Sequence, residues 1–216
     1  MFTQDFEVSV LQLPHDIGDW DLVTRFMHFR KEIFVDQKSW PLHHADGAEF
    51  EQYDGFDTVY VVAHRGREVL GGARLKRTDR LYGHGKVVYS YMIRDACLGL
   101  LPGMPRELCF DEPPVDDTIW ELTRFAARCE PGVGEAILRA SNDFLFRQEA
   151  TRCLFLGPPA FLRMAKKLGW EPQAMGGVCQ NDDGRFLAFQ CGVISPDQGH
   201  VGPMLAAETP AFAGHC

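Results

Sequence analysis

Three clusters of charged residues in this chain each adjoin an apolar stretch. The first contains Arg30, in the run Phe-Arg-Lys-Glu-Ile-Phe over residues 29–34; the second is acidic and covers residues 49–54; the third holds Glu121 and Arg124. A charge beside a buried segment is costly unless it is paired or used. Three such places in one small domain therefore predict a single polar site.

The residue types of these clusters suit the binding of a small charged molecule. A guanidinium such as that of Arg30 can hold a carboxylate through two parallel hydrogen bonds, and the faces of Phe34 and Trp40 can hold a cation or an aromatic ring. Glu51 and Asp54 could pair with an arginine and stabilise a cationic ligand. The structural alternatives are an amphipathic helix with a surface arginine and a core tryptophan, and a solvated acidic loop.

Arg74, Glu121 and Arg124 lie in segments that read as strands. Arg74 stands among Gly, Ala and Leu residues, so it is either a member of an ion-pair network or an edge-strand arginine that points to water. Glu121 and Arg124 are three positions apart. In a regular strand they would face opposite sides, unless a bulge intervenes. A structural ion pair is the alternative to a catalytic role.

The order and spacing of these motifs resemble the acyl-homoserine-lactone synthases, the autoinducer synthases of bacterial quorum sensing. The family pattern reads Arg-x3-Phe, then Trp, Glu-x-Asp-x-Tyr-Asp, Gly-x-Ala/Cys-Arg-Leu and Glu-Leu-Ser-Arg-Phe. In this chain the five elements are residues 30–34, Trp40, residues 49–54, residues 72–75 and residues 121–125. They stand in the family's order, and the resemblance covers about residues 20–194.

The resemblance implies an acyltransferase that N-acylates S-adenosylmethionine from an acyl thioester and then closes a lactone, with release of methylthioadenosine. It implies no cofactor, because S-adenosylmethionine is a substrate. Glu121, as general base, Glu51 and Asp54 are the implied catalytic residues. The residues implied for S-adenosylmethionine binding are Arg30, Phe34, Trp40, Asp54, Arg74, Arg124 and Phe125. Position 51 is usually Asp in the family, so Glu51 departs by one methylene.

The acyl group of the product cannot be deduced from the sequence. Candidate residues for an acyl-chain pocket are Leu122, Thr123, Leu154, Leu156 and Met164, for which ordinary core packing is the alternative. The segment 128–134 approaches the phosphate-binding loop of coenzyme-A-dependent acyltransferases, but it has one residue too many and an acid, Glu130, at the helix start. His43 and His44 lack further ligands nearby, so no metal site is expected.

Composition limits the class of protein. The 216 residues predict one domain, with 45% hydrophobic and 24% charged residues, as in ordinary globular proteins. A net charge of −8 argues against nucleic-acid binding, and no apolar run approaches the roughly eighteen residues of a membrane helix. Seven cysteines without a Cys-x-x-Cys pair, and a start without signal-peptide features, favour the cytoplasm.

The charge is unevenly distributed along the chain. Residues 128–170 carry seven basic and four acidic side chains, a net charge of +3 on an acidic protein. The basic residues that could dock an acidic carrier are Arg147, Arg152, Arg163, Lys166 and Lys167. Acyl carrier protein is one candidate donor partner and coenzyme A the other. Solvated helix faces are the alternative explanation for these charges.

Periodicity predicts an alternation of strands and helices. Helices are expected over 19–34, 93–101, 131–149 and 159–168, and strands over 58–64, 69–76, 87–92, 118–127, 152–156 and 185–193. Residues 35–55 read as a long loop, and the adjacent glycines 71 and 72 indicate a bulge or a close approach of backbones.

This pattern predicts a mixed α/β sheet, and the resemblance narrows it to a GNAT-like three-layer αβα sandwich around a mixed, splayed central sheet. Residues 1–194 are expected to form one domain with an N-terminal lid at about 20–55, and residues 195–216 a poorly ordered tail. Two other functions stay open: a GNAT-fold N-acyltransferase that acts on a different amine, and a ligand-binding protein without turnover.

Overall fold

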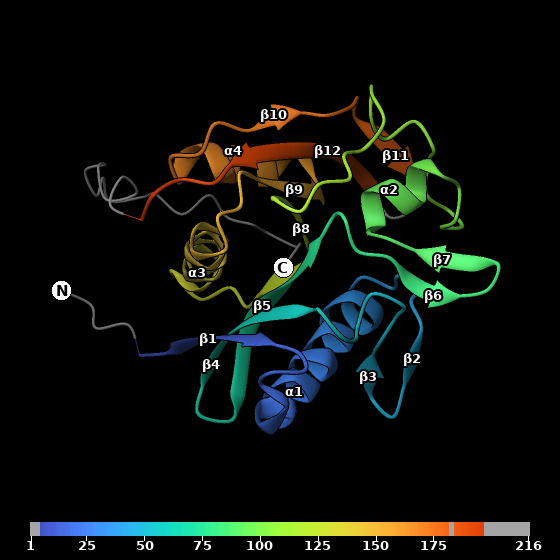
Figure 1. The fold of residues 1–216 in the computed structure, drawn as a ribbon. Coiled ribbons are helices and arrows are strands. Elements are labelled where there is room, and N and C mark those ends of the chain that lie inside the picture. Colours follow the sequence, from blue (N-terminus) through green and yellow to red (C-terminus); the bar gives the residue numbers. More distant parts are fainter. Residues whose placement is uncertain (1–4, 182–183, 197–216) are drawn as a thin grey trace.

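An eight-stranded mixed sheet runs through the centre of the protein (Figure 1). The computed structural model describes residues 5–181 and 184–196. The strand order is β1-β4-β5-β8-β9-β12-β10, and β11 pairs with β12. Only β8 and β9 run parallel; every other pair in this sheet is antiparallel. The strands are β1 (Glu7–Gln12), β4 (Val59–Arg65), β5 (Glu68–Arg77), β8 (Ile119–Ala127), β9 (Arg152–Gly157), β10 (Gln173–Ala174), β11 (Cys179–Asn181) and β12 (Gly184–Gly192).

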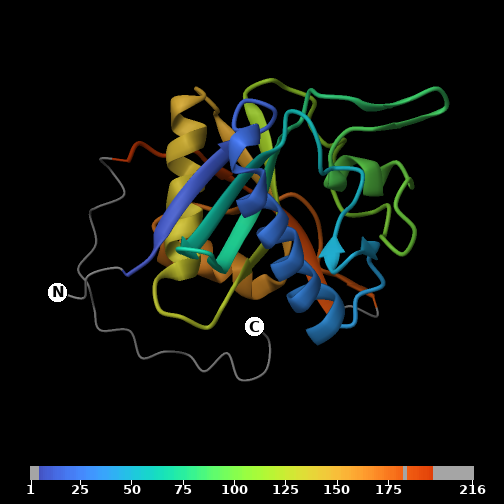
Figure 2. The same ribbon diagram turned by 90° about the horizontal axis from the view of Figure 1, so that it is seen from below.

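Helices cover both faces of this sheet, as Figures 1 and 2 show from two directions. On one face lie α1 (Trp20–Arg30), which continues as the π-helix η2 (Lys31–Gln37), and the short α2 (Met92–Cys97). On the other lie α3 (Val133–Arg147) and α4 (Pro159–Lys167). The predicted three-layer αβα architecture is therefore confirmed.

The hairpin of β4 and β5 at the centre of the sheet forms where the sequence signals are strongest. The β-branched run after residue 58 forms β4, which is buried along nearly its whole length, and Gly66, with a φ of 57°, makes the tight turn into β5. The predicted close approach at the adjacent glycines is also present. A Cβ atom on Gly72 would lie 2.6 Å from the ring of Phe26, so only glycine lets α1 pack this closely on β5.

Each face of the sheet carries its own cluster of buried apolar side chains. Val23, Phe26 and Met27 of α1 pack on β4 and β5, and the helix-spaced apolar residues of α3 build a second cluster on the opposite face. α3 begins after Gly132, whose φ of 85° places the backbone in the left-handed region. Tyr91 and Ile93 form a third, smaller cluster beneath α2.

Strand β8 departs from regular geometry at its centre. The pairing of β5 with β8 joins Gly72 to Ala126 but Arg74 to Thr123, so two steps along β5 face three steps along β8. The extra residue is a β-bulge at which Arg124 adopts a φ of 53°. On its other side β8 pairs with β9 only from residue 119 to residue 122, although β9 continues to residue 157. The two strands therefore separate beyond Leu122, which is the predicted splay.

Some sequence expectations were incomplete. The edge strand β1 was not predicted, and residues 35–55, predicted as a loop, contain the end of η2 and a hairpin of β2 (His44–Ala45) and β3 (Ala48–Glu49). A second hairpin, β6 (Tyr82–His84) with β7 (Val87–Tyr89), precedes α2. Most of the predicted tail, residues 197–216, lies outside the described residues. No helix in the described part of the chain has both the length and the apolar character to cross a membrane.

Candidate active site

Six charged side chains from distant parts of the chain meet on the α1 face of the sheet. Three are guanidinium groups and three are carboxylates, so their formal charges cancel. They are Arg30 at the end of α1, Arg74 on β5, Arg124 on β8, Glu49 on β3, and Glu51 and Asp54 in the following loop. The side chain of Glu51 is the most exposed of the six, at 13%.

Arg30 and Asp54 form the centre of this network. Arg30 donates from Nη1 and Nη2 to the two carboxylate oxygens of Asp54 at 2.7 and 2.8 Å, and from Nε to Glu49. Asp54 also accepts from the hydroxyl of Tyr60 at 2.9 Å and from the backbone N–H of Glu51 at 3.0 Å. This bidentate geometry, together with complete burial, makes Arg30 a structural anchor of the network.

Glu51 joins the two other arginines. Its two carboxylate oxygens lie 2.6 Å from Nη2 of Arg74 and 2.7 Å from Nη2 of Arg124. Arg74 further donates from Nε to the hydroxyl of Thr123 at 3.1 Å, and Arg124 from Nε to Glu49 at 3.3 Å. The ion pairs therefore close into a ring, and the side chain of Glu51 is long enough to bridge both guanidiniums.

The arginines of the network keep the buried carboxylates of Asp54 and Glu51 ionised. Burial alone would raise the pKa of the Asp54 carboxyl, but Arg74 and Arg30 hold it well below the usual range. Burial also opposes the ionisation of Glu51, and Arg124 and Arg74 overcome it, so that its pKa is lowered. The pKa of Arg74, which burial would lower, is raised by Asp54 and Glu51.

The bulge in β8 explains how Glu121 and Arg124 come to share a face. Leu122 and Phe125 both pack in the α3-side core, whereas Thr123 and Arg124 both bond to the network on the other side. The extra residue shifts the alternation of side chains along β8 by one position. Glu121 and Arg124, three positions apart, therefore point to the same face instead of opposite faces. The expectation that a bulge would be needed is confirmed.

Glu121 is buried at the N-terminus of α2. Its two carboxylate oxygens accept the backbone N–H groups of Met92 at 2.9 Å and Ile93 at 2.7 Å. Burial raises the pKa of Glu121 to about 7, although these two hydrogen bonds favour the ionised form. A carboxyl group with a pKa near neutrality can both accept and release protons under physiological conditions.

Two aromatic side chains lie next to the network. The rings of Phe34 and Trp40 are stacked, with centroids 5.1 Å apart and planes at 9°. The guanidinium of Arg124 lies 5.8 Å from the Phe34 centroid, and the amine of Lys38 lies over both rings. The structure thus places Phe34 and Trp40 beside the charged residues with which the motif groups them.

Phe125 is placed differently. Its ring stacks on Phe161 at 5.0 Å in the α3-side core, away from the ion-pair network on the opposite face. Its predicted role in S-adenosylmethionine binding stays a prediction without a contact to the network in its support.

The residues predicted for an acyl-chain pocket do not gather at one place. Leu122 and Met164 belong to the α3-side core, whereas Leu154 and Leu156 pack beneath α2 on the other face. Thr123 binds Arg74. Leu122 is therefore on the opposite face of the sheet from Leu154 and Leu156, and the acyl-pocket assignment stays a prediction.

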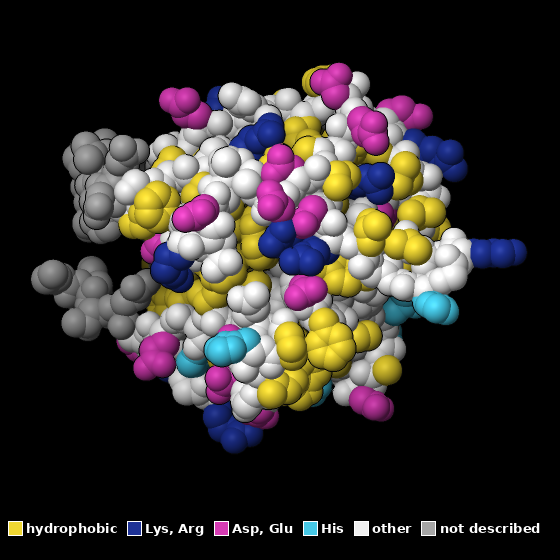
Figure 3. Space-filling view, viewed as in Figure 1, with side chains coloured by type: hydrophobic (Ala, Val, Ile, Leu, Met, Phe, Trp, Pro, Cys, Tyr) yellow, Lys and Arg dark blue, Asp and Glu magenta, His cyan; other side chains and the backbone are white. Residues whose placement is uncertain are grey.

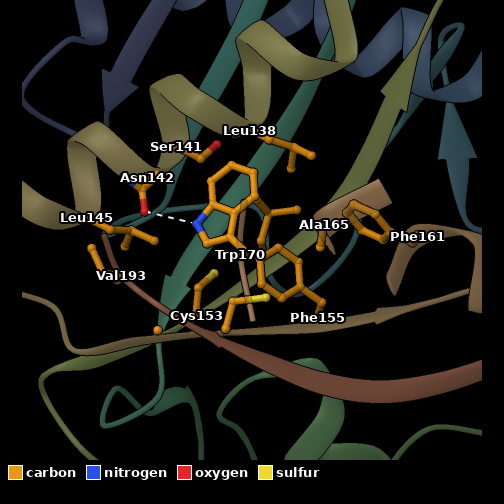
Figure 4. A pocket seen from close by; sticks show the side chains of 13 residues that line it. Leu138, Ser141, Asn142, Leu145, Cys153, Phe155, Phe161, Ala165, Trp170 and Val193 are labelled. Atoms are coloured by element: carbon orange, nitrogen blue, oxygen red, sulfur yellow. Dashed lines mark hydrogen bonds between the residues drawn. The ribbon is translucent and has the colours of Figure 1, made fainter. Parts of the chain in front are cut away.

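An apolar cavity of about 20 Å³ lies on the α3 side (Figure 4). Leu122 and Phe155 contribute to it from the sheet, and Trp170 also lines it, with Nε1 3.4 Å from Oδ1 of Asn142. The remaining lining residues are Leu138, Ser141, Leu145, Cys153, Phe161, Ala165, Cys191, Gly192 and Val193. This space adjoins the gap where β8 and β9 separate.

Several polar residues of the site were absent from the sequence prediction. Glu49 stood within the acidic run 49–54 but was not assigned a role, and Tyr60 carried no motif. Tyr53 donates to Asp95 of α2 at 2.8 Å and so links the acidic loop to that helix. The repeated spacing of acids in the run was the only signal that could have included Glu49.

The charged residues of the segment 128–134, which approaches a phosphate-binding loop in sequence, are engaged in ion pairs. Arg128 forms two hydrogen bonds of 3.1 Å with Glu32, and Glu130 lies 2.6 Å from Arg65. In the described residues one acidic group has the spacing of metal ligands, namely Glu49, Glu51 and Asp54. Three guanidiniums already supply the positive charge that a cation would bring there.

Comparison with known proteins identifies the class to which this fold and site belong. Residues 20–130 match the autoinducer synthase family. An acyl-homoserine-lactone synthase from Pseudomonas fluorescens is 32% identical over 176 residues, which cover 80% of this chain and 81% of that protein. The chain belongs to the autoinducer synthase family.

Other relatives agree with this assignment over different lengths. A synthase from Ralstonia solanacearum is 42% identical over 104 residues, which are 47% of this chain and 43% of that protein. One from Acinetobacter nosocomialis is 28% identical over 183 residues, or 79% and 90% of the two chains. The chain therefore spans less than half of the first relative and most of the second.

Solved structures show the same fold. A crystal structure of TofI in a ternary complex with an inhibitor and MTA aligns with a TM-score of 0.68 and 26% identity, over 87% of this chain and 91% of TofI. A CoA-dependent acyl-homoserine lactone synthase, BjaI, with SAM and isopentyl-CoA, aligns with a TM-score of 0.74 and 21% identity, over 90% and 88% of the two chains.

Proposed function

We propose that this protein is an acyl-homoserine-lactone synthase that makes a quorum-sensing signal from S-adenosylmethionine and an acyl thioester. The observation that carries the proposal is the buried, charge-balanced ring of three arginines and three carboxylates beside a stacked aromatic pair. S-adenosylmethionine carries an ammonium, a carboxylate and a sulfonium, so its recognition calls for groups of both signs and an aromatic face. Membership of the autoinducer synthase family supports the same assignment.

The proposed first step is acyl transfer to the α-amine. The amine loses a proton to Glu121, attacks the thioester carbonyl, and expels the thiol. Each oxygen of Glu121 accepts one backbone N–H of α2 and keeps a further lone pair with which to accept a proton. With its pKa raised to about 7 by burial, Glu121 is a stronger base than an ordinary carboxylate.

We place the thioester of the acyl donor at the gap between β8 and β9. Beyond Leu122 the backbone of β8 has no ladder partner on the β9 side. An unpaired backbone N–H there could stabilise the oxyanion that forms on the carbonyl oxygen. The apolar cavity next to this gap is the proposed end of the acyl path, and its small volume favours a pocket that opens as the chain enters.

The proposed second step closes the lactone. The substrate carboxylate attacks the γ-carbon and displaces methylthioadenosine, which leaves readily because the sulfonium is positively charged. The ion-pair ring would hold the substrate so that carboxylate and γ-carbon approach each other, and such positioning supplies much of the rate gain. Residues 20–55, with Phe34 and Trp40, are proposed as a lid over the bound substrate. The predicted cytoplasmic location is part of this proposal.

We infer acyl carrier protein as the donor in preference to coenzyme A. Arg128, which could have held coenzyme A phosphates, is paired with Glu32. Arg163, Lys166 and Lys167 are exposed on α4 and could meet an acidic carrier. On the side drawn in Figure 3, basic and acidic side chains are interspersed and form no continuous basic surface.

A product assay tests the proposed function directly. The purified protein is incubated with S-adenosylmethionine and a panel of acyl thioesters on acyl carrier protein and on coenzyme A, and products are identified by mass spectrometry. We expect an acyl-homoserine lactone and methylthioadenosine from at least one donor. Acylated product without methylthioadenosine would show an N-acyltransferase for another amine, and no product with any donor would contradict the proposal.

A further inference from the structure

Lys76 is a buried lysine that no motif assigned to the site. Its side chain points to the same face of β5 as that of Arg74, two residues before it, and only 1% of Lys76 is exposed. The amine donates to the hydroxyl of Thr58 at 3.0 Å and to the backbone carbonyl of Phe56 at 3.4 Å. It also lies 3.5 Å from the ring centroid of Tyr82. Two neutral oxygens and a ring therefore hold this amine.

Lys76 lies directly opposite Glu121. The two residues are paired in the antiparallel register of β5 and β8, which places their Cβ atoms about 5 Å apart. Both are buried to 99%, yet no ion pair joins them. In the described part of the chain, no ion pair joins Lys76 to any carboxylate, which is unusual for a buried amine.

Both groups have pKa values near neutrality. Burial, followed by the charge of Arg74, lowers the pKa of Lys76 to about 7, and burial raises the pKa of Glu121 to about 7. The charge of Glu121 favours the ionised amine of Lys76, so the ionisation of one residue is linked to that of the other.

We propose that Lys76 is a positioning residue for catalysis, whose charged amine, held opposite Glu121, keeps that carboxylate ionised and ready to take the proton of the substrate amine. The proposal rests on the proposed function, in which Glu121 is the base. The proton that Glu121 takes from the amine passes on to the departing thiolate, which restores the carboxylate for the next turnover and leaves Lys76 charged throughout.

Other ionisable groups face Lys76 and Glu121. They are the same in the wild type and in a variant changed at Lys76 alone. Around Glu121 they are Arg74 on β5, Asp95 on α2, Cys153 on β9, and Tyr53, Tyr91 and Cys109 in the loops. Around Lys76 they are Arg74, Asp54 and Asp57. A change at Lys76 alone therefore isolates its own charge.

The test is the pH profile of kcat/KM for Lys76→Met, a neutral side chain of similar length. Loss of the positive charge makes Glu121 harder to ionise, so its pKa rises and the acidic limb of the profile moves upward by about one pH unit. The ratio of wild-type to variant rates is then largest at pH 6 and declines toward high pH. Arg77→Met is the matched control, since Arg77 is on the same strand as Lys76 and pairs with Asp79 in the turn that follows. The control should leave the limb in place.

A pH-independent loss of rate in Lys76→Met would contradict the proposal and give Lys76 a merely structural role. A second measurement needs neither activity nor a folded Met variant. NMR titration of lysine side chains in the wild-type protein should show Lys76 titrating near pH 7, and in Glu121→Gln its midpoint should fall further. A midpoint near 10, or one that Glu121→Gln leaves unchanged, would overturn the proposal even if the wild type makes lactone. Coupled titration without any lactone would instead refute only the proposed function.

Discussion

Arg30 joins two of the three carboxylates of the ion-pair network. Its guanidinium binds Asp54 with two hydrogen bonds and Glu49 with a third, and its side chain is fully buried. Removal of this charge would leave two carboxylates in a place where water does not reach them. The cost of an uncompensated buried charge exceeds the net gain of most ion pairs.

Arg30→Ala should therefore lower the free energy of unfolding by about 3–5 kcal/mol. Arg25→Ala is the matched control on the same helix, because Arg25 makes an exposed pair with Asp21 at 2.8 Å and its loss should cost far less. Urea unfolding at one pH measures both. Similar losses in the two variants would show that the ring contributes little to stability.

The sequence predicted the site residues that belong to a motif. It did not predict contacts that depend on strand register or on backbone groups. The spacing of Arg30, Glu51 and Asp54 placed them in one site, and the structure brings them together. The partners of Glu121 could not be read from the sequence, because two backbone N–H groups of a distant helix carry no side-chain signature. The pairing of Lys76 with Glu121 likewise depends on strand register.

At the scale of elements, the lid proposed for residues 20–55 can be tested through its aromatic pair. Phe34 lies in η2 and Trp40 follows it, and the two rings stack beside Arg124. Trp40→Ala should raise the KM for S-adenosylmethionine about tenfold, which corresponds to roughly 1–2 kcal/mol for one lost aromatic face, and change the KM for the acyl donor much less.

Steady-state kinetics with each substrate varied in turn measures this difference. Trp20→Ala is the control, since Trp20 begins α1 and is 41% exposed. Equal effects of Trp40→Ala on both substrates would assign Trp40 to folding and not to the lid.

Elements with strong periodicity were predicted well, and those defined by pairing alone were not. The ranges expected for α1, β4, β5, α3 and α4 agree with the structure to within a few residues. Strand β1 was missed because a short edge strand has no long apolar run. The sequence alone could not show that Leu122 of β8 and Leu154 of β9, both predicted for the acyl pocket, lie on opposite faces of the sheet.

At the scale of the whole molecule, the distribution of charge predicts how the donor arrives. The protein is acidic overall, while α4 exposes Arg163, Lys166 and Lys167. If the donor is acyl carrier protein, the double variant Lys166→Glu with Lys167→Glu should weaken its use about tenfold or more, and moderate salt should have a similar effect.

Kinetics with carrier-bound and coenzyme-A-bound donors in parallel measures this effect. The double variant Arg80→Glu with Lys86→Glu, next to and within the β6–β7 hairpin, changes net charge equally and is the control. An equal loss with both donors, or a loss in the control alone, would refute docking at α4.

The measurement that tests the central claim most directly compares wild type and Glu121→Gln in a single turnover. The account predicts that the wild type releases one methylthioadenosine and one free thiol for each lactone. In Glu121→Gln all three should slow together by a factor of roughly 10²–10⁴, while calorimetry shows S-adenosylmethionine still bound. Near-normal release of lactone by Glu121→Gln, or thiol release without lactone in the wild type, would contradict it.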